Sequence, residues 1–428
     1  MSGRAPIGVI GTGYVGLVTA AGFAELGSDV YCVDIDSEKV ARLQRGEVPI
    51  YEPGLEELIE RNSERLHFST EIGDALGAAR LQFVAVGTPP TYSGDADLSA
   101  VHAVADAIPA SDDHALVMKS TVPCGTGASL VRDFGQQGKS GLGYVSCPEF
   151  LKEGSAVRDF LHPDRVVVGD TGDWAGDAVV QLYEPLGAPL VRTDVASAEM
   201  VKLASNAFLA TKISFINEIA NVCEETGADV IEVARGMGLD DRIGAKFLQA
   251  GIGYGGSCFP KDVEALKQLA GNSGYHFQLL TAVIEVNELQ KRRVIGKLQH
   301  RLGDLAGKRV ALLGLAFKPQ TDDMREASSL VLAARLQAAG AEVSAYDPVA
   351  HEEARELLRG VHFAETAIEA VRDCDAAVLV TEWPEIVGLD FDRVAREMRG
   401  DVLIDGRNAL DPDKMRAAGL RYEGIGRR

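Results

Sequence analysis

The fold of this chain is decided close to its start, in the stretch Ile7-Gly8-Val9-Ile10-Gly11-Thr12-Gly13-Tyr14-Val15-Gly16. Its first four residues are mostly apolar, as is typical of a buried parallel strand, and residues 17–26 predict a helix. A second strand is expected at 29–33, and it ends at Asp34, eighteen residues after Gly16. Strand, glycine turn, helix, strand and terminal acid in this order predict a dinucleotide-binding domain with a parallel sheet.

The glycine turn and the acid predict which ligand this domain binds. Gly11, Gly13 and Gly16 allow backbone N–H groups and a helix N-terminus to approach a pyrophosphate. The Asp34 carboxylate would accept hydrogen bonds from ribose hydroxyls and would repel a 2′-phosphate. The pattern therefore favours NAD over NADP, and the alternative is a domain of this fold with an empty site.

Polar residues follow three further expected strands, which end near residues 86, 118 and 146. Thr88, Thr121 and Glu149 each come just after one of these strands. Because the carboxyl ends of parallel strands form the ligand crevice, we expect the three side chains to line one pocket. For any one of them alone, the alternative role is to cap a helix.

A long helix is expected at about 197–227, with Ser197 as its N-cap, and a further helix at about 277–302. Lys202 and Asn206 are four residues apart, so they share one face of the first helix. An ammonium and a carboxamide beside apolar neighbours indicate a lined cavity. The alternative is a solvated lysine next to a polar asparagine, since helix spacing does not distinguish the two.

A second glycine-rich stretch has the sequence Gly251-Ile252-Gly253-Tyr254-Gly255-Gly256-Ser257-Cys258-Phe259-Pro260-Lys261-Asp262. Four glycines in six residues let the backbone turn tightly and approach a ligand. A cation near the Cys258 thiol would increase the thiolate fraction, and the Asp262 carboxylate could orient a water or move a proton. The alternative is a glycine-rich turn that contains an ordinary buried cysteine.

The last third of the chain repeats the first in weaker form. A strand is expected at 309–313, and residues 340–347 match residues 27–34 in spacing, which predicts a second doubly wound domain. Its first turn lacks the glycine triplet and is followed by Lys318 and Arg325. That turn suits a phosphate-bearing ligand better than a second dinucleotide.

Composition limits the possible functions. A chain of 428 residues is too long for one core, so two or three domains are expected. A net charge of −20 argues against nucleic acid or an anionic membrane as a partner. The six cysteines lack the spacing of a disulfide framework or of a zinc site, so no metal is expected. There is no long apolar run and no signal-peptide pattern, so a cytoplasmic location is expected.

Several motifs in this order resemble the UDP-glucose/GDP-mannose dehydrogenase family over nearly the whole chain. They are residues 11–16, 119–123, 148–154, 202–206 and 251–262, with Phe317-Lys318-Pro319 and Met324-Arg325-Glu326. Members of this family oxidise a sugar C6 hydroxyl to a carboxylate in two steps, using two NAD⁺ and one water. The resemblance implies the same activity here.

The resemblance also implies roles for individual residues. NAD would be held by Gly11, Gly13, Gly16, Asp34, Lys39, Thr88, Thr121, Glu153 and Arg325. Cys258 would be the nucleophile, with acid, base and oxyanion partners in Lys202, Asn206, Glu149, Asp262 and Thr121. The nucleotide sugar would contact Phe150, Leu151, Lys152, Lys202, Asn206, Phe247, Gly251, Gly255 and Lys318. Arg242 would reach the sugar of a neighbouring subunit, because family members are homodimers or larger oligomers joined through the central helix.

The fold implied is α/β, with two Rossmann-like doubly wound parallel-sheet domains joined by a long central helix in an all-α dimerisation segment. We expect an NAD-binding domain at 1–195, a central helical domain with the cysteine loop at 196–300, and a UDP-sugar-binding domain at 301–428.

The chemistry explains why a thiol is needed. A Cys258 thiolate can capture the reactive aldehyde as a thiohemiacetal, which then loses a hydride to give a thioester. Lys202 and Asn206 could stabilise the oxyanions of both halves, and we favour Glu149 for thioester hydrolysis. The first base is either Lys202 or a water held by Asp262, and the sequence does not decide between them.

Finer resemblance concerns the substrate. Residues 247–254 and 317–323 are similar to the UDP-glucose branch of the family, and Ser257 stands where dehydrogenases of UDP-N-acetyl sugars carry His. UDP-glucose is therefore the expected substrate. The chain departs from the family at Cys147, which stands where Asn usually precedes Pro-Glu-Phe. This thiol is interpreted as a small hydrophobe, and the alternative is a site sensitive to oxidation.

Two other classes of function remain open from the sequence. A simple two-electron NAD dehydrogenase, such as a hydroxyacid enzyme, would leave Cys258 and the third segment without a role. A non-catalytic sensor of nucleotide sugars would have no need of Cys258, Lys202 and Asp262.

Overall fold

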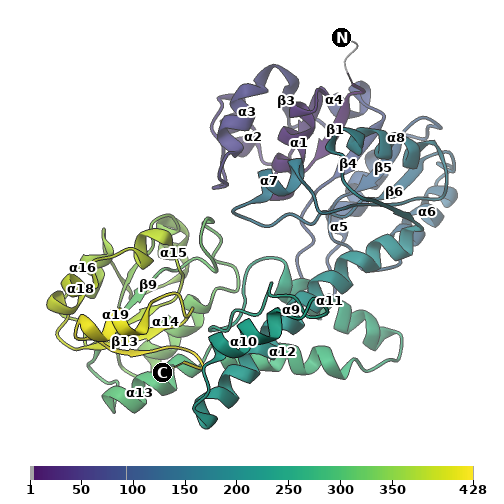
Figure 1. Ribbon diagram of the computed structural model, residues 1–428. Coiled ribbons are helices and arrows are strands. Elements are labelled where there is room, and N and C mark those ends of the chain that lie inside the picture. The colour runs from purple at the N-terminus through teal and green to yellow at the C-terminus, as the bar shows by residue number, and fades with distance from the viewer. Residues whose placement is uncertain (1–3, 93, 428) are drawn as a thin grey trace. The chain divides into compact units, whose positions relative to one another are not determined.

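The computed structural model describes residues 4–92 and 94–427, and these form two compact units. The first unit comprises the described residues up to Ser205 together with Gln268–Gly274. The second comprises Asn206–Lys267 and the described residues from Tyr275 onward. Each unit contains one sheet with helices packed against it (Figure 1).

The first unit is built on an eight-stranded sheet with the strand order β3-β2-β1-β4-β5-β6-β7-β8. Its strands are β1 (Ile7–Ile10), β2 (Val30–Val33), β3 (Leu66–Ser69), β4 (Leu81–Val84), β5 (Ala115–Met118), β6 (Gly143–Ser146), β7 (Val166–Gly169) and β8 (Leu190–Thr193). The pairs from β3 to β6 are parallel, and β7 meets β6 in antiparallel orientation. The order reverses beside β1, which is where open α/β sheets bind ligands.

Helices cover both faces of this sheet because successive side chains of each strand point to opposite faces. On β5, Val117 enters one buried cluster, whereas Leu116 and Met118 enter another. The first cluster receives α1 (Tyr14–Glu25), α2 (Ser37–Gln44), α3 (Leu55–Arg61), α7 (Ala156–Leu161) and α8 (Trp174–Tyr183). The second receives α4 (Ile72–Ala78), α5 (Ser99–Ala107) and α6 (Thr126–Gln136). This is the doubly wound arrangement that the first sixteen residues predict.

The long helix α9 (Val195–Thr226) carries Lys202 and Asn206. The prediction that Ser197 caps it is wrong. The helix begins at Val195, and Asp194 Oδ1 accepts the Ser197 N–H at 2.9 Å, because a carboxylate one residue before the helix reaches the unpaired amides of its first turn. Within the described part of the chain, no helix combines the length and apolar character that a membrane span requires.

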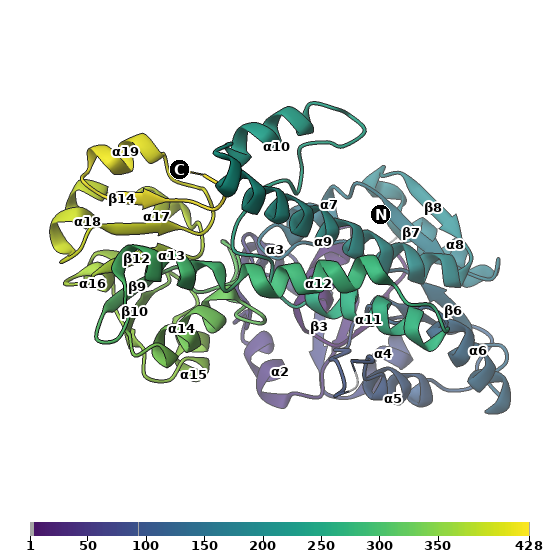
Figure 2. The ribbon, with the colours of Figure 1, turned by 90° about the horizontal axis from the view of Figure 1, so that it is seen from below.

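The second unit joins helices to a six-stranded parallel sheet of order β11-β10-β9-β12-β13-β14. The strands are β9 (Arg309–Leu313), β10 (Glu342–Tyr346), β11 (His362–Phe363), β12 (Ala376–Leu379), β13 (Val402–Asp405) and β14 (Arg421–Glu423). The helices are α10 (Val230–Gly238), α11 (Phe259–Asn272, whose last five residues belong to the first unit), α12 (Gln278–Gln290), α13 (Arg293–Leu302), α14 (Ser328–Ala338), α15 (His351–Leu357), α16 (Ala367–Val371), α17 (Pro384–Val387), α18 (Phe391–Glu397) and α19 (Pro412–Ala417). The helix expected at 277–302 is therefore two helices, and α12 runs beside α9 (Figure 2).

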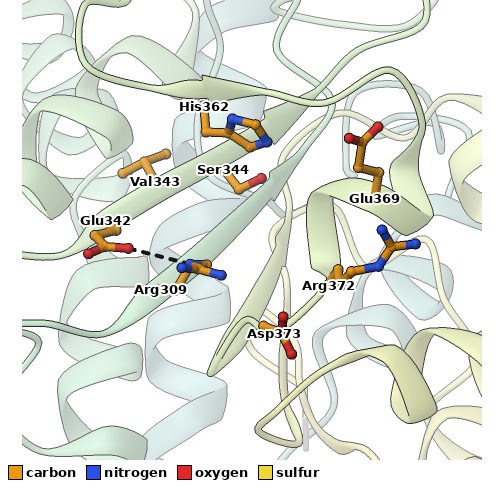
Figure 3. Close-up of a pocket in the computed structure, with 8 residues that line it drawn as sticks. All are labelled: Arg309, Glu342, Val343, Ser344, His362, Glu369, Arg372 and Asp373. Carbon is orange, nitrogen blue, oxygen red and sulfur yellow. Dashed lines mark hydrogen bonds and ion pairs between the residues drawn. The ribbon is translucent and has the colours of Figure 1, made fainter.

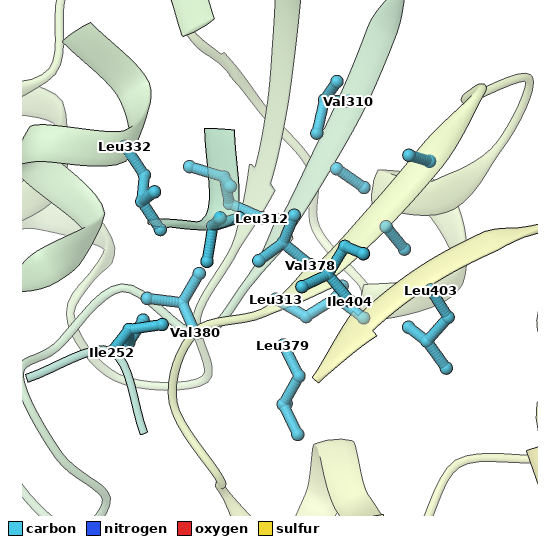
Figure 4. Packing of buried hydrophobic residues seen from close by; sticks show 14 of the residues in the cluster. Ile252, Val310, Leu312, Leu313, Leu332, Val378, Leu379, Val380, Leu403 and Ile404 are labelled. Carbon is cyan, nitrogen blue, oxygen red and sulfur yellow. The ribbon is translucent and has the colours of Figure 1, made fainter. Parts of the chain in front are cut away.

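The core of the second unit reaches the glycine-rich stretch. Apolar side chains of β9, β12 and β13, including Leu312, Val378 and Ile404, pack together in one buried cluster (Figure 4). Ile252 belongs to the same cluster and is fully buried. Burying such a side chain contributes about 2 kcal/mol, so the core holds the start of the cysteine loop in place. Two parallel-sheet α/β domains with a long central helix confirm the expected fold class.

Candidate active site

The glycine turn of the first unit has the shape that a pyrophosphate needs. Gly11 has a φ of 96°, and a Cβ on Gly16 would lie 1.8 Å from the Gly11 carbonyl oxygen, so both positions exclude side chains. A Cβ on Gly13 would meet no atom of the described chain within 4 Å. Gly13 directly precedes α1, whose N-terminus has no side-chain cap. The turn therefore exposes an uncapped helix N-terminus, which fits an anionic ligand such as the NAD pyrophosphate.

Asp34 lies at the end of β2 beside this turn. Its Oδ2 accepts the backbone N–H and the hydroxyl of Thr12, both at 2.8 Å, and Lys39 Nζ lies 3.2 Å away. Burial raises the pKa of the Asp34 carboxyl, but hydrogen bonds from the Asp36 and Thr12 amides and the charge of Lys39 outweigh it and lower that pKa. Asp34 is thus held ionised as an acceptor, as a ribose hydroxyl requires.

The loops after β4 and β5 are tied to each other. The Thr88 hydroxyl donates to the Thr121 carbonyl at 2.9 Å, and the Ser120 hydroxyl donates to the Val86 carbonyl at 2.7 Å. Both loops leave the carboxyl edge of the sheet, so the structure brings Thr88 and Thr121 together as expected.

Glu149 and Lys202 form a buried ion pair. Lys202 Nζ lies 2.8 Å from Glu149 Oε1, and both side chains are at most 5% exposed. Glu149 Oε2 also accepts the Leu151 N–H at 2.5 Å. Burial raises the pKa of Glu149, but the charge and hydrogen bond of Lys202, the Leu151 amide and the charge of Lys119 together leave it lowered. These contacts therefore favour the ionised form of the carboxylate.

The loop that follows Glu149 carries further predicted residues. The Arg165 guanidinium carbon lies 3.6 Å from the centre of the Phe150 ring, and Lys202 Nζ lies 5.5 Å from it. Leu151 packs at the edge of the buried cluster, whereas Lys152 is exposed and pairs with Asp159 at 3.3 Å. Arg165 is not predicted from the sequence.

Glu52 was also missed, although it holds this loop. Its carboxylate accepts the Gly154 and Ala156 N–H groups at 2.6 and 2.7 Å and also contacts the Tyr14 hydroxyl. Burial raises the pKa of Tyr14, and the nearby Glu52 and Glu153 raise it further. Glu52 thus connects the loop of residues 149–156 to the first residue of α1, which places Glu153 near the glycine turn.

In the second unit, Cys258 directly precedes α11. The Asp262 N–H donates to the Cys258 carbonyl at 2.9 Å, and the Ser257 hydroxyl lies 3.5 Å from the Cys258 sulfur. The side chain is partly accessible. A helix N-terminus favours negative charge, so this position suits a thiolate nucleophile.

Asp262 and Asn206 form a second buried polar pair. Asn206 Nδ2 donates to Asp262 Oδ2 at 2.7 Å, and Asp262 is 1% exposed. Lys261 Nζ lies 3.2 Å from Asp262 Oδ1, but among the described residues that oxygen accepts no hydrogen bond. A buried carboxylate oxygen with spare acceptor capacity fits a role in holding a water or a substrate hydroxyl.

Buried amides fix the glycine-rich loop. The Gly251 N–H donates to Asn217 Oδ1 at 2.8 Å, and Asn287 exchanges two hydrogen bonds with the Tyr254 backbone at 2.8 and 3.1 Å. A Cβ on Gly255 would lie 2.3 Å from the Glu326 carbonyl oxygen. These hydrogen bonds hold the loop in place. The backbone of Gly255 closely approaches that of Glu326, so there is no room for a side chain at this position.

The loop lies against the carboxyl edge of the C-terminal sheet. The Gly256 N–H donates to the Arg325 carbonyl at 2.8 Å, so Arg325 belongs to the surroundings of this loop. Arg407, which is not predicted from the sequence, donates to the carbonyls of Gly253 and Phe317 at 3.2 and 2.9 Å. Lys318 Nζ lies 5.2 Å from the centre of the Phe317 ring. The glycine-rich loop, Arg407 and Lys318 thus lie at the carboxyl edge of the sheet, where open parallel sheets bind ligands such as a nucleoside diphosphate.

Phe247 and Arg242 precede the loop. Phe247 adopts a left-handed backbone with a φ of 66°, which costs a non-glycine residue about 1–3 kcal/mol and is found mostly at functional sites. Its ring packs edge-on against Phe259 at 6.2 Å. The Arg242 side chain is 89% exposed and pairs with Asp240.

Asp347 shows why the second sheet does not repeat the NAD site. It occupies the position that corresponds to Asp34, but it is fully buried. Its Oδ2 accepts the Leu315 and Ala316 N–H groups and the Trp383 indole N–H, at 2.6, 3.1 and 3.0 Å. These bonds leave Asp347 inaccessible to a ribose.

A cavity of about 350 Å³ lies at the opposite edge of this sheet (Figure 3). Arg309 and Glu342, the first residues of β9 and β10, line it with His362, the first residue of β11. Ligands of open parallel sheets bind at the carboxyl ends of the strands, so the position of this cavity does not match the nucleotide site.

Models of known families match three segments of the chain. They describe the UDP-glucose/GDP-mannose dehydrogenase family: its NAD binding domain at residues 5–187, its central domain at 196–289 and its UDP binding domain at 311–412. Together these matches cover most of the sequence.

Individual relatives are similar along their whole length. UDP-glucose 6-dehydrogenase TuaD of Bacillus subtilis is 48% identical, and the match covers 98% of this chain and 93% of that protein. UDP-glucose 6-dehydrogenase of Pseudomonas aeruginosa is also 48% identical, over 98% and 97% of the two chains. A solved UDP-glucose dehydrogenase from Pyrobaculum islandicum has a TM-score of 0.93 at 41% identity, over 100% and 99% of the two chains.

Proposed function

The chain belongs to the UDP-glucose/GDP-mannose dehydrogenase family, and we propose that it oxidises the C6 hydroxyl of UDP-glucose to the carboxylate of UDP-glucuronate, with two NAD⁺ and one water. Relatives named UDP-glucose 6-dehydrogenase at 48% identity over nearly the whole chain support this substrate. The UDP binding model at residues 311–412 supports the nucleotide part of it. We keep the boundaries 1–195, 196–300 and 301–428 as the proposed domain division.

NAD⁺ supplies the hydride acceptor of both oxidations when it is bound. Gly11, Gly13 and Gly16 would hold its pyrophosphate, and Asp34 beside Lys39 would accept from its ribose hydroxyls. The residues proposed to complete the site are Thr88, Thr121, Glu153 and Arg325.

The nucleotide sugar is proposed to lie on the glycine-rich loop and the carboxyl edge of the second sheet. Gly251, Gly255, Phe247 and Lys318 are proposed to supply contacts there. Phe150, Leu151 and Lys152 are proposed as further substrate contacts. Arg242 is proposed to contact the substrate of a second subunit, in keeping with its exposed position.

In the first half-reaction a base removes the C6 hydroxyl proton while C6 loses a hydride. Two arrangements support two candidates for this base. Lys202 Nζ lies 2.8 Å from Glu149 Oε1, and as a base it would first have to lose its ammonium proton to become the free amine. Asp262 Oδ1 has the spare acceptor capacity to hold a water.

In the second half-reaction the Cys258 thiolate attacks the C6 aldehyde, and a C–S bond forms as the carbonyl oxygen takes a proton. The resulting thiohemiacetal loses a second hydride from C6 together with its hydroxyl proton and becomes a thioester. Glu149 then removes a proton from a water, whose oxygen adds to the thioester carbon. The C–S bond breaks, and the thiolate and the uronate carboxylate are released. Lys202 and Asn206 donate to the oxyanions of both halves.

A homodimer through the central helices is also proposed. Phe208, Phe215 and Val222 follow one another at seven-residue intervals on α9, and all three are exposed in the single chain. Leu279 and Leu289 of the neighbouring α12 are exposed as well. An apolar stripe with this spacing is typical of a helix that packs against a partner helix. The cytoplasmic location remains a prediction.

The observation that carries the four-electron reaction is the partly accessible Cys258 thiol at the N-terminus of α11, one helical turn before Asp262. We expect Cys258→Ala to abolish formation of UDP-glucuronate, measured by anion-exchange chromatography, while calorimetric binding of NAD⁺ is retained. Cys124→Ala, at another partly accessible cysteine, should behave as wild type. Uronate production by Cys258→Ala at the normal rate would exclude the thiol mechanism.

A further inference from the structure

Lys119 is a buried lysine that the proposed reaction does not use. It follows β5 directly and is 5% exposed. Its Nζ donates to the Cys147 sulfur at 3.7 Å and lies 5.3 Å from the centre of the Tyr183 ring. Among residues 4–92 and 94–427, no carboxylate forms an ion pair with it.

Burying this ammonium lowers the stability of the fold. A buried ammonium loses much of its hydration, and the Cys147 thiol sulfur is a weak acceptor that replaces little of it. The Tyr183 ring, 5.3 Å from Nζ, adds a further but modest attraction. The fold therefore places a positive charge here without a direct counterion.

The charge of Lys119 can act on the carboxylate of Glu149, which lies at the start of the loop next to Cys147. Cys147, the partner of Lys119, lies two residues before Glu149. Glu149 is buried and already pairs with Lys202 at 2.8 Å. We infer that Lys119 is a positioning residue that acts through Glu149, because its ammonium adds a second positive charge to that of Lys202 and keeps the carboxylate ionised.

The surroundings of Glu149 agree with this role. The groups that face this region lie on or beside five elements. They are Lys202 of α9, Lys119 after β5, Cys147 after β6, Tyr183 of α8 and, across the Phe150 ring, Arg165 before β7. Three of the named groups are cations, namely Lys202, Lys119 and Arg165. The carboxylate they face is that of Glu149, which contacts Lys202 directly. Burial raises the pKa of Glu149, and among the opposing influences the charge of Lys119 acts in the same direction as that of Lys202.

The consequence for catalysis rests on the proposed function. During turnover Lys202 is expected to turn toward the developing oxyanion, which weakens its hold on Glu149. The Lys119 charge stays, because its side chain is fixed between Cys147 and Tyr183. Glu149 can then still be ionised when a water must be deprotonated.

The ionisation of Glu149 can be measured without substrate. Difference infrared spectra of the whole enzyme, recorded while the pH is lowered within the range where circular dichroism shows an intact fold, report the carboxylic acid C=O band. Glu149→Gln identifies the band that belongs to Glu149. We expect Lys119→Gln, which keeps a hydrogen-bond donor and loses the charge, to raise the midpoint of this band by roughly one pH unit.

Two variants serve as matched controls. Lys119→Arg keeps the charge and should return the midpoint to the wild-type value. Cys147→Ser keeps the charge and changes the partner of Lys119, so it should leave the midpoint unchanged. If Lys119→Gln does not fold, Lys119→Met replaces it, since Met can pack against the Tyr183 ring.

An unchanged midpoint in a folded, uncharged Lys119 variant would overturn the inference, and so would a shift in Cys147→Ser as large as that in Lys119→Gln. In turnover assays the acid limb of kcat should move upward in Lys119→Gln by the same amount as the infrared midpoint. Because the infrared midpoint is read without substrate, it tests Lys119 even if the enzyme turned out not to oxidise UDP-glucose.

Discussion

The Nζ atom of Lys202 lies 2.8 Å from Oε1 of Glu149, and neither side chain is more than 5% exposed. Burying such a pair removes the hydration of both charged groups. Removing either partner leaves the charge of the other buried and uncompensated, which destabilises the fold. The pair therefore links the stability of the fold to the ionisation of two residues with proposed catalytic roles.

Removal of Lys202 alone should be strongly destabilising. We expect Lys202→Met to lower the free energy of unfolding by about 3–5 kcal/mol, because it leaves a buried carboxylate without its nearest cation. Lys152→Met, at the exposed ion pair with Asp159, should cost less than about 1 kcal/mol. The double variant Lys202→Met/Glu149→Gln should cost clearly less than the sum of its single changes in denaturant unfolding. Additive costs would show that the two side chains are not coupled.

The same pair should shape stability at acid pH. The pKa of Glu149 in the folded chain is below its ordinary value of 4.5, so its ionised form contributes stability above that pH. This contribution is lost as the pH falls through the lowered folded value. Denaturant unfolding at a series of pH values should therefore show a steeper acid loss of stability in wild type than in Glu149→Gln. Parallel curves below pH 4.5 would contradict the assignment.

Glu52 should matter for both stability and coenzyme binding. Glu52→Ala leaves the Gly154 and Ala156 amides without their acceptor, and each buried amide left unpaired costs about 1–3 kcal/mol. The loop of residues 149–156 should loosen, so we expect the KM for NAD⁺ to rise more than kcat falls. Glu60→Ala, on the exposed side of the nearby α3, is the control and should change stability by less than about 0.5 kcal/mol. An unaltered KM for NAD⁺ in Glu52→Ala would show that the Glu52 hydrogen bonds to Gly154 and Ala156 do not affect the NAD site.

Asp34 should set the choice of coenzyme. Asp34→Ser removes a charged acceptor of the ribose hydroxyls, and hydrogen bonds to charged groups contribute about 1.5–3 kcal/mol. We expect kcat/KM with NAD⁺ to fall about ten- to a hundredfold and the ratio of NADP⁺ to NAD⁺ use to rise. Asp29 directly precedes β2 and forms an exposed ion pair with Arg65, so Asp29→Ser should leave the ratio unchanged. If Asp34→Ser kept the wild-type ratio, the acid would have no part in discriminating the coenzymes.

The parts of the site that the sequence predicts are those that depend on local spacing. Gly11, Gly16 and Asp34 lie within one strand–turn–helix–strand unit, whose geometry follows from a few dihedral angles and the sheet period. The Lys202 and Asn206 side chains share a helix face for the same reason.

The parts that were missed depend on contacts between residues far apart in the chain. Glu52 meets Gly154 across 102 positions, and Arg407 meets Gly253 across 154. No periodic pattern in the sequence predicts such pairs, because they depend on how distant loops pack together in the folded chain. The wrong N-cap at Ser197 is a smaller case, since two acceptors adjoin the helix start and the carboxylate of Asp194 reaches the amides first.

In the proposed reaction one active site performs two oxidations on one carbon, and Cys258 retains the substrate between them. The most direct measurement is the amount of NADH formed per UDP-glucose consumed, with excess NAD⁺ and purified protein. We expect a ratio of two and an acidic product. A ratio of one, with the aldehyde released, would contradict the role of Cys258 in carrying the intermediate to the second oxidation.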